Sequence, residues 1–184
     1  HEQVFLLARF RDTFTQHVGV ALSEFSALER MQSKARFVRL LDELDLPQPA
    51  TRIVRSKNDL QQHDQFPCYV KLAHSTAGRG VHLVHDRSHL QQLAEDMDSN
   101  GQFDGDYETL IQQPAKGTQS TVQAVFQHGQ LVGGHMVQAR AIGVGGMASA
   151  RVSVTHTDVL KHVARLGRHL NWHGAMFLDY FYDA

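Results

Sequence analysis

The stretch PCYVKLAHSTAGRGVHLVHD, Pro67–Asp86, places a glycine-containing loop between two short apolar segments, with one lysine before the loop. In a P-loop the lysine instead follows the glycines and opens a helix. Here Lys71 precedes Gly78 and Gly80, and the residues after Gly80 alternate like a strand. The pattern therefore predicts a strand, a loop and a strand, with small residues that let backbone N–H groups approach phosphate oxygens. A solvated hairpin, whose lysine extends its ammonium into water, is an equal alternative for this stretch alone.

The composition, with 42% hydrophobic and 20% charged residues, is typical of a soluble globular protein. The 18 basic and 19 acidic side chains form no basic run, which argues against a nucleic-acid partner. No apolar run reaches the roughly 18 residues that span a bilayer, so we expect no membrane partner. The single cysteine, Cys68, is compatible with a reducing compartment, and we expect a cytoplasmic protein. Because the chain has no initiator Met and ends within an expected strand, we interpret it as part of a longer protein.

Hydrophobic periodicity predicts an α+β fold with mostly antiparallel strands. The clearest helix is expected over residues 26–44, with a capping-box pattern at Ser26 and Glu29 and two prolines after its end. Further helices are expected from residue 88 and over residues 158–170. Strands are expected over residues 68–72, 81–84, 109–113, 120–127, 130–140, 150–154 and 175–182, with a hairpin turn at His128–Gly129. Strands and helices do not alternate regularly, which favours α+β over a doubly wound sheet.

Two charged residues lie within otherwise apolar strands. A lysine is rarely buried without a partner, so we expect an anion near Lys71, with Arg79 as a further positive group. Asp179 shares a face with Phe177 and Phe181 by strand alternation. A buried carboxylate needs a partner or a cation, which favours a hard cation such as Mg²⁺; the alternative is an edge strand with Asp179 facing water.

Zinc chemistry and nucleophilic catalysis are not favoured. The sequence contains neither HExxH nor GxSxG, and its 13 histidines are scattered. Cys68 lies within an expected strand and lacks the surroundings of a nucleophile. A turn within residues 110–121 joins two expected strands and is a candidate hinge between two lobes.

Five segments, in this order, resemble motifs of the ATP-grasp superfamily. The segments are SALERMQSKARFVRLLDELDLPQPAT (26–51), FPCYVKLAHSTAGRGVHLVHDRSHL (66–90), LIQQPAKG (110–117), GQLVGGHMVQAR (129–140) and LNWHGAMFLDYFYDA (170–184). The last two, with the glycines that follow residue 140, look most like a carbamoyl-phosphate-synthase-like branch of carboxylate-amine ligases. The resemblance covers most of the chain, from about residue 26 to residue 184.

This resemblance implies a nucleotide site. Lys34 and Lys71 would contact the α- and β-phosphates. The loop residues His74, Ser75, Thr76, Ala77, Gly78, Arg79 and Gly80 would close over the β- and γ-phosphates, Gln112, Gln113, Pro114 and Ala115 would bind adenine, and Gln119 would bind the ribose. In the family, glutamates commonly occupy the places of Gln113 and Gln119, so this chain has uncharged groups there.

The resemblance also implies roles for three charged residues. Asp179 matches the first metal-binding acid, whereas the second acid belongs to an E-x-N-P-R motif that this sequence does not contain. Arg140 and Arg151 are expected on strands that face one cleft, where they would orient a carboxylate or phosphate; surface salt bridges are the alternative.

The fold that the resemblance implies has two α+β lobes that clamp a nucleotide. Residues 1–49 would lead into it, residues 50–111 would form a lid with the flexible loop 74–80, and residues 112–184 would form a larger, incomplete lobe. The implied reaction uses ATP and Mg²⁺, with Mn²⁺ as a substitute, to activate a carboxylate as an acyl phosphate for attack by an amine. The implied partners are therefore small-molecule acids and amines, and the chain could also form a homodimer. The alternatives are a nucleotide-binding module without catalysis and a kinase-like enzyme that phosphorylates a small molecule.

Overall fold

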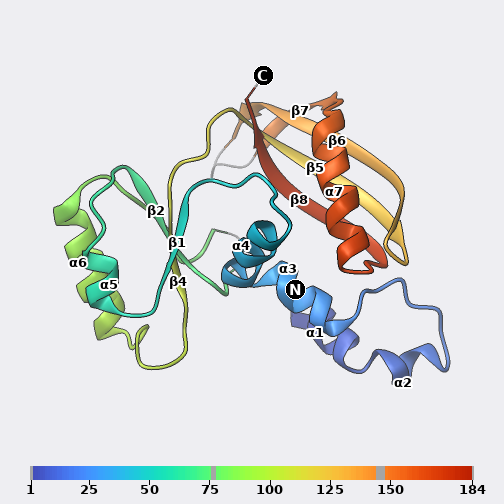
Figure 1. Cartoon of the computed structure of the whole chain (residues 1–184), viewed down its shortest axis with the longest axis horizontal. Coiled ribbons are helices and arrows are strands. Elements are labelled where there is room, and N and C mark those ends of the chain that lie inside the picture. The colour runs from blue at the N-terminus through green and yellow to red at the C-terminus, as the bar shows by residue number, and fades with distance from the viewer. Residues whose placement is uncertain (1, 76–77, 144–147, 184) are drawn as a thin grey trace. The chain divides into compact units, whose positions relative to one another are not determined.

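A computed structural model describes residues 2–75, 78–143 and 148–183, which form two compact units (Figure 1). Unit 1 comprises His1–Glu29 and Lys116–Ala184, and unit 2 comprises Arg30–Ala115. Each unit contains one four-stranded antiparallel sheet, which confirms the α+β prediction. The predicted division into a lead-in segment (residues 1–49), a lid (residues 50–111) and a larger lobe (residues 112–184) stays a prediction.

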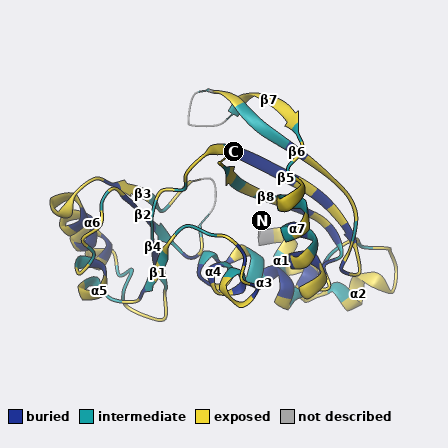
Figure 2. Cartoon of the chain, turned by 45° about the horizontal axis from the view of Figure 1, so that its top comes forward, coloured by how far each residue is buried: buried dark blue, intermediate teal, exposed yellow. Residues whose placement is uncertain are grey.

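Unit 2 has helices on both faces of its sheet. The strands are β1 (Thr51–Val54), β2 (Cys68–Leu72), β3 (Val81–Val84) and β4 (Thr109–Gln112), in the order β1-β4-β2-β3. Helices α5 (Lys57–Gln61) and α6 (Arg87–Ser99) cover one face, where Val70 and Ile111 are buried (Figure 2). Helix α4 (Lys34–Glu43) covers the other face, where Ala35 packs with Leu110. Because neighbouring strand residues point to opposite faces, Tyr69, Lys71 and Gln112 lie on the α4 face.

Unit 1 has a longer sheet with helix α7 on one face. Helices α1 (Glu2–Arg9) and α2 (Arg11–Thr15) precede the strands β5 (Thr118–Gln127), β6 (Gln130–Ile142), β7 (Ala148–Val154) and β8 (Gly174–Tyr182), in the order β7-β6-β5-β8. Helix α7 (Thr157–His169) packs closely on β5, since a Cβ atom on Gly167 would lie 2.1 Å from Phe126. The opposite face, which we call the outer face, carries Thr121, Gln123 and Val125 of β5.

The single helix expected over residues 26–44 is two helices, and this prediction was wrong. Helix α3 (Phe25–Gln32) ends before Ser33, whose backbone is extended and whose Oγ accepts a hydrogen bond from the N–H of Arg36. Apolar residues keep the same spacing across the break, so periodicity did not reveal it. The expected cap at Ser26 is also wrong, because Ser26 lies within α3. The break makes Lys34 the first residue of α4.

Other local predictions are confirmed. Helices α6 and α7 begin within one residue of the expected positions, and Asp86 caps α6 by accepting a hydrogen bond from the N–H of His89. The β5–β6 connection is a two-residue turn in which His128 and Gly129 both have positive φ, 47° and 79°. These values are typical of the turns that join twisted antiparallel strands.

Candidate functional site

Lys71 lies in the middle of the unit 2 sheet, on the α4 face. Strand β2 pairs with both β3 and β4, so the backbone of Lys71 is held on both sides. Its Nζ donates a hydrogen bond of 2.6 Å to Oε1 of Gln112 and lies 5.2 Å from the centre of the Tyr69 ring. The Gln112 amide in turn donates to Oγ1 of Thr51 at 2.9 Å. The ammonium of Lys71 is therefore held by neutral groups.

Lys34 lies at the start of α4, next to the segment that follows β2. Its backbone N–H donates to the carbonyl of Ala73 at 2.9 Å, and its Nζ donates to the carbonyl and Oγ of Ser75 at 2.9 and 2.8 Å. The backbone bond to Ala73 depends on the break at Ser33, which leaves the first N–H groups of α4 without intrahelical partners. The sequence resemblance indicated Lys34, but only the structure identifies Ser75 as its partner.

The two lysines form an electropositive pair in unit 2. Burial lowers the pKa of Lys34, and the positive charge of Lys71 lowers it further. Burial also lowers the pKa of Lys71. Within the described residues of unit 2, neither ammonium forms an ion pair with a carboxylate. Since a buried cation is stabilised by an anion, the pair is suited to a ligand with several negative charges, such as a polyphosphate.

The glycine loop closes directly on the β2–β3 hairpin. The N–H of Leu72 donates to the carbonyl of Gly80 at 2.9 Å, and Gly78 and Gly80 have φ values of 75° and 64°. A Cβ on Gly80 would lie 2.7 Å from Cδ1 of Leu72, so this close approach favours glycine. His74 and Arg79 are exposed and Ser75 is half-buried, whereas Thr76 and Ala77 lie outside the described residues.

The segment expected to bind adenine begins at Gln112, the last residue of β4. The N–H of Gln113 donates to the carbonyl of Ala50, and the side chain of Gln113 donates to the carbonyl of Gln65 at 3.4 Å. Pro114 and Ala115 then end unit 2. The side chain of Gln112 is engaged by Lys71, a role that the sequence did not indicate.

Asp179 lies on the outer face of the unit 1 sheet. It is opposite Thr121 in the β5–β8 register, and Oγ1 of Thr121 donates to its Oδ1 at 2.8 Å. Asp179 is exposed on an edge strand, and Gln119 lies two residues from Thr121 on the same face. The described residues contain no group of three or more His, Cys, Asp or Glu side chains able to hold a metal ion. Among the described residues, Asp179 therefore belongs to no such three-ligand group, and its role as a metal ligand stays a prediction.

The two arginines proposed for one cleft lie on neighbouring strands. Arg151 of β7 is opposite Ala139, so it lies on the outer face. Arg140 follows Ala139 at a register shift, where strand alternation does not fix the face of its side chain. Both side chains are exposed. The expectation that the pair faces one cleft, and the role of each arginine, stay predictions.

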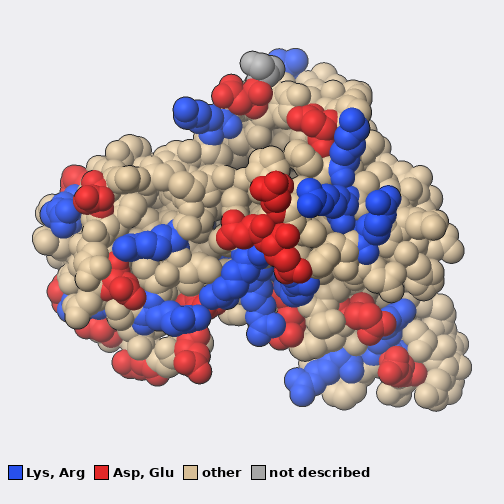
Figure 3. Space-filling view, in the orientation of Figure 1, with Lys and Arg blue, Asp and Glu red and all other residues tan. Residues whose placement is uncertain are grey.

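Neither surface charge nor hydropathy marks a particular region as the site. On the face of the molecule shown in Figure 3, positive and negative side chains are intermixed. Among the described helices, none combines the length and the apolar content needed to cross a bilayer.

The structure is similar to those of several solved enzymes. It matches an L-amino acid ligase from Bacillus licheniformis with a TM-score of 0.72 and 15% identity, over 97% of this chain and 45% of the ligase. It matches D-alanyl-alanine synthetase A from Vibrio cholerae with a TM-score of 0.70 and 14% identity, over 95% of this chain and 59% of the synthetase. It matches biotin carboxylase from Campylobacter jejuni, solved as a β-γ-ATP complex, with a TM-score of 0.77 and 14% identity, over 96% and 44% of the two chains.

The chain therefore spans about half the length of these enzymes. No protein-family model matches the sequence. No curated protein matches it either.

Proposed function

The chain has the ATP-grasp fold, and from this premise we propose that it belongs to a ligase that uses ATP and Mg²⁺ to join a carboxylate to an amine. The sequence motifs and the similarity in fold support the superfamily. The narrower assignment to a carbamoyl-phosphate-synthase-like branch stays a prediction. The division into a lid and a larger lobe belongs to the same proposal.

The observation that carries the proposal is the pair Lys34 and Lys71. Both ammonium groups are partly buried, each donates to neutral oxygens, and the charge of Lys71 lowers the pKa of Lys34. A bound α,β-diphosphate would supply the negative charge that unit 2 does not provide among its described residues. Hydrogen bonds from an ammonium to a phosphate are stronger than those to a neutral oxygen. A phosphate would therefore favourably replace the oxygens of Ser75 or Gln112 as the acceptor for Lys34 or Lys71.

The chain's own residues would act mainly by position and charge. When bound, ATP supplies a γ-phosphoryl group that a carboxylate oxygen takes up as ADP leaves, after which the amine displaces phosphate from the acyl carbon and loses a proton. Lys34 and Lys71 would hold the nucleotide phosphates and stabilise negative charge there. Ser75 and the glycine loop would cover the phosphates and exclude water.

A magnesium ion fits the described residues only in part. Asp179 offers one carboxylate oxygen that Thr121 leaves accessible. Magnesium is commonly bound by one or two carboxylates together with substrate phosphates and water. Asp179 would therefore be the single ligand that the described residues supply to the metal ion. Substrate phosphates and water would supply the other ligands.

The second candidate is a nucleotide-binding module without catalysis. It is favoured by the uncharged residues Gln113 and Gln119 where the family commonly has glutamate, and by the lack of a three-ligand metal group among the described residues. The two candidates agree on nucleotide binding and differ only in turnover.

One assay separates these functions. The protein, with any flanking residues that its gene encodes, is incubated with Mg-ATP and a panel of acids and amines, and ADP, phosphate and acyl products are quantified. A ligase releases ADP and phosphate with a matching acid and amine and forms an amide. A kinase-like enzyme accumulates a phosphorylated product without an amine. Calorimetric binding of Mg-ATP without release of ADP across the panel indicates the module, and lack of Mg-ATP binding refutes both candidates.

A further inference from the structure

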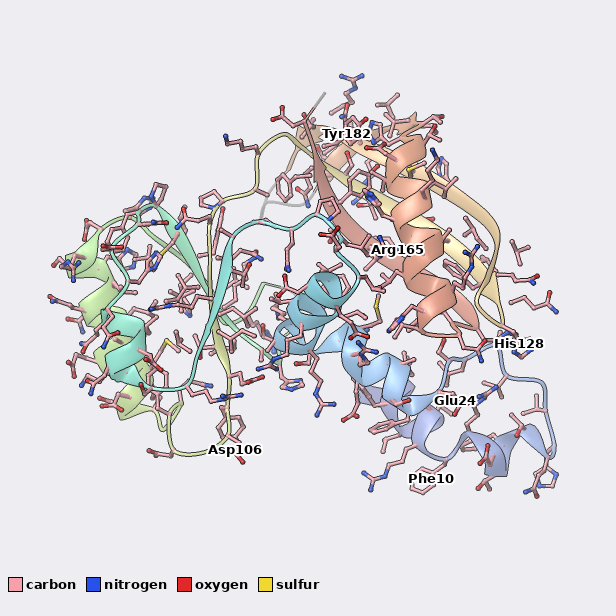
Figure 4. All side chains as sticks on the ribbon, in the orientation of Figure 1. Phe10, Glu24, Asp106, His128, Arg165 and Tyr182 are labelled. Atoms are coloured by element: carbon pink, nitrogen blue, oxygen red, sulfur yellow. The ribbon has the colours of Figure 1, made fainter. Side chains whose placement is uncertain are left out.

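An open hollow of about 540 Å³ lies on the outer face of the unit 1 sheet. This volume is within the range of about 300–1,000 Å³ that is typical of small-molecule sites. The residues that shape it come from β5, β6 and β8: Gln123, Val125, Gly133, His135, Ala175 and Phe177. Figure 4 labels His128 at the hairpin end of this sheet and Tyr182 at the end of β8, and the hollow lies toward the His128 end.

The register explains why the surface is hollow at this place. Val125 is opposite Gly133 on one side and Ala175 on the other, so two of these three positions carry little or no side chain. A Cβ atom on Gly133 would have no atom within 4 Å, which shows that the space above it is open. In the next row, Gln123 is flanked by His135 and Phe177.

The hollow has an apolar side and a polar side. Phe177 and Val125 are 61% and 52% exposed, which is unusual for large apolar side chains close together on a sheet. His135 is held at the other side, with its Nε2 3.0 Å from Oγ of Ser153. A flat apolar group would cover Phe177 and Val125 and gain free energy from the surface that it removes from water.

The hollow is continuous with the surface around Asp179. Phe177 and Asp179 lie on the same face two residues apart, or about 7 Å along the strand, and Ala175 lies about 14 Å from Asp179 at a rise of about 3.4 Å per residue. A carboxylate placed near Asp179 and its metal would extend its carbon chain along β8 over Phe177 toward Ala175, and Gly133 lies two strands, or about 10 Å, to the side of Ala175. This span matches an acyl chain of several carbons or one with a terminal ring.

We propose that the outer-face hollow between Phe177 and Gly133 binds the apolar, preferably aromatic, body of the carboxylate substrate. This inference rests on the proposed function, in which Asp179 holds the Mg²⁺ ion of the reaction and the carboxylate would react beside that ion. It goes further in that it names the class of acid: one with an extended apolar body rather than a short or highly charged acid.

The test uses 4-phenylbutanoate and butanoate, which share a carboxylate and differ in the ring. Each acid is titrated calorimetrically into the protein with Mg²⁺ and a non-hydrolysable ATP analogue. We expect 4-phenylbutanoate to bind at least about tenfold more tightly than butanoate, since even one methylene in an apolar pocket changes selectivity by about that factor. Titration of 4-phenylbutylamine tests whether the hollow instead serves the amine.

Two variants change the hollow without touching the core. Gly133→Val fills the open space above β6, and Phe177→Ala removes an exposed ring, so neither is expected to unfold unit 1. Both should weaken 4-phenylbutanoate about tenfold and leave butanoate and the ATP analogue unchanged. Gly19→Val is the matched control, because a Cβ on Gly19 also meets no atom within 4 Å and Gly19 does not line the hollow.

The outcomes distinguish this inference from the proposed function. Equal binding of the two acids, tighter binding of the amine, or unchanged binding of 4-phenylbutanoate in Gly133→Val overturns the assignment of the hollow while nucleotide binding stands. If the ATP analogue does not bind the wild-type protein, the proposed function fails. In that case, titrations of 4-phenylbutanoate and butanoate without nucleotide, into the wild type and Gly133→Val, show separately whether the hollow binds the ring.

Discussion

Replacement of Lys71 by methionine tests whether the lysine pair serves a ligand or the fold. The variant keeps most of the side-chain stem but removes the ammonium that donates to Gln112. A hydrogen bond to a charged group contributes about 1.5–3 kcal/mol, and about 1.4 kcal/mol corresponds to tenfold in affinity. We therefore expect Mg-ATP to bind the variant about 10- to 100-fold more weakly in a calorimetric titration.

The same variant should have nearly unchanged stability. Loss of the donor leaves Oε1 of Gln112 without its partner, which costs about 1 kcal/mol. Against this, methionine removes the cost of burying an ammonium and its repulsion with Lys34. We expect the free energy of unfolding in urea to change by less than about 1 kcal/mol, because these effects have opposite signs.

The lowered pKa of Lys71 makes both the stability and the affinity for Mg-ATP depend on pH. Lys71 binds its proton more tightly in the unfolded chain than in the folded one. The free energy of unfolding of the wild type should therefore increase as the pH rises from the lowered pKa to the ordinary value of 10.5. Lys71→Met should lack this part of the increase. Over the same interval, affinity for Mg-ATP should fall as Lys34 and Lys71 lose charge.

Lys57→Met is the matched control for Lys71→Met. Lys57 belongs to the same unit, but it forms ion pairs with Glu95 and Asp98 instead of neutral contacts. Its replacement should leave Mg-ATP affinity unchanged. The reasoning is refuted if Lys71→Met binds Mg-ATP as tightly as the wild type, or if both variants lose affinity equally.

Three further predictions concern other parts of the chain. Asp179→Asn should raise the Mg²⁺ concentration that supports half-maximal turnover more than it weakens nucleotide binding in calorimetry, because Asp179 is proposed as a metal ligand. Glu108→Gln should lower the urea stability of unit 2 by about 1–2 kcal/mol at neutral pH, since Glu108 accepts from Arg39 and Arg55. These bonds lower the pKa of Glu108, so that stability should disappear as pH falls below its ordinary 4.5. Gly167→Ala should destabilise unit 1 by at least about 1 kcal/mol in thermal unfolding, because its Cβ would meet Phe126; a stabilised variant contradicts this packing.

Prediction from sequence succeeded where local patterns and order along the chain carry the information. Lys71 and Asp179 stood out because each is a charge within an apolar strand, and strand alternation correctly placed Asp179 with Phe177. Prediction from sequence failed for features that depend on contacts between residues distant in the chain or on local hydrogen bonds. The apolar spacing continues through Ser33, so only the cap on α4 reveals that one predicted helix is two. Alternation within single strands also could not place the side chain of Arg140, because the register of β6 with β7 shifts at this residue.

The sequence by itself determined the α+β class, the ATP-grasp resemblance and the identity of the charged candidates, because periodicity and motif order are properties of the chain. The tertiary structure decided which groups meet. Lys34 reaches Ser75, and the charge of Lys71 lowers the pKa of Lys34, only because α4 packs on the face of the sheet that carries Lys71. The hollow beside Asp179 likewise exists only because the register places Gly133, Val125 and Ala175 side by side. Residues that are distant in sequence acquire a shared environment only through packing and strand register, and a shared environment is what a binding site requires.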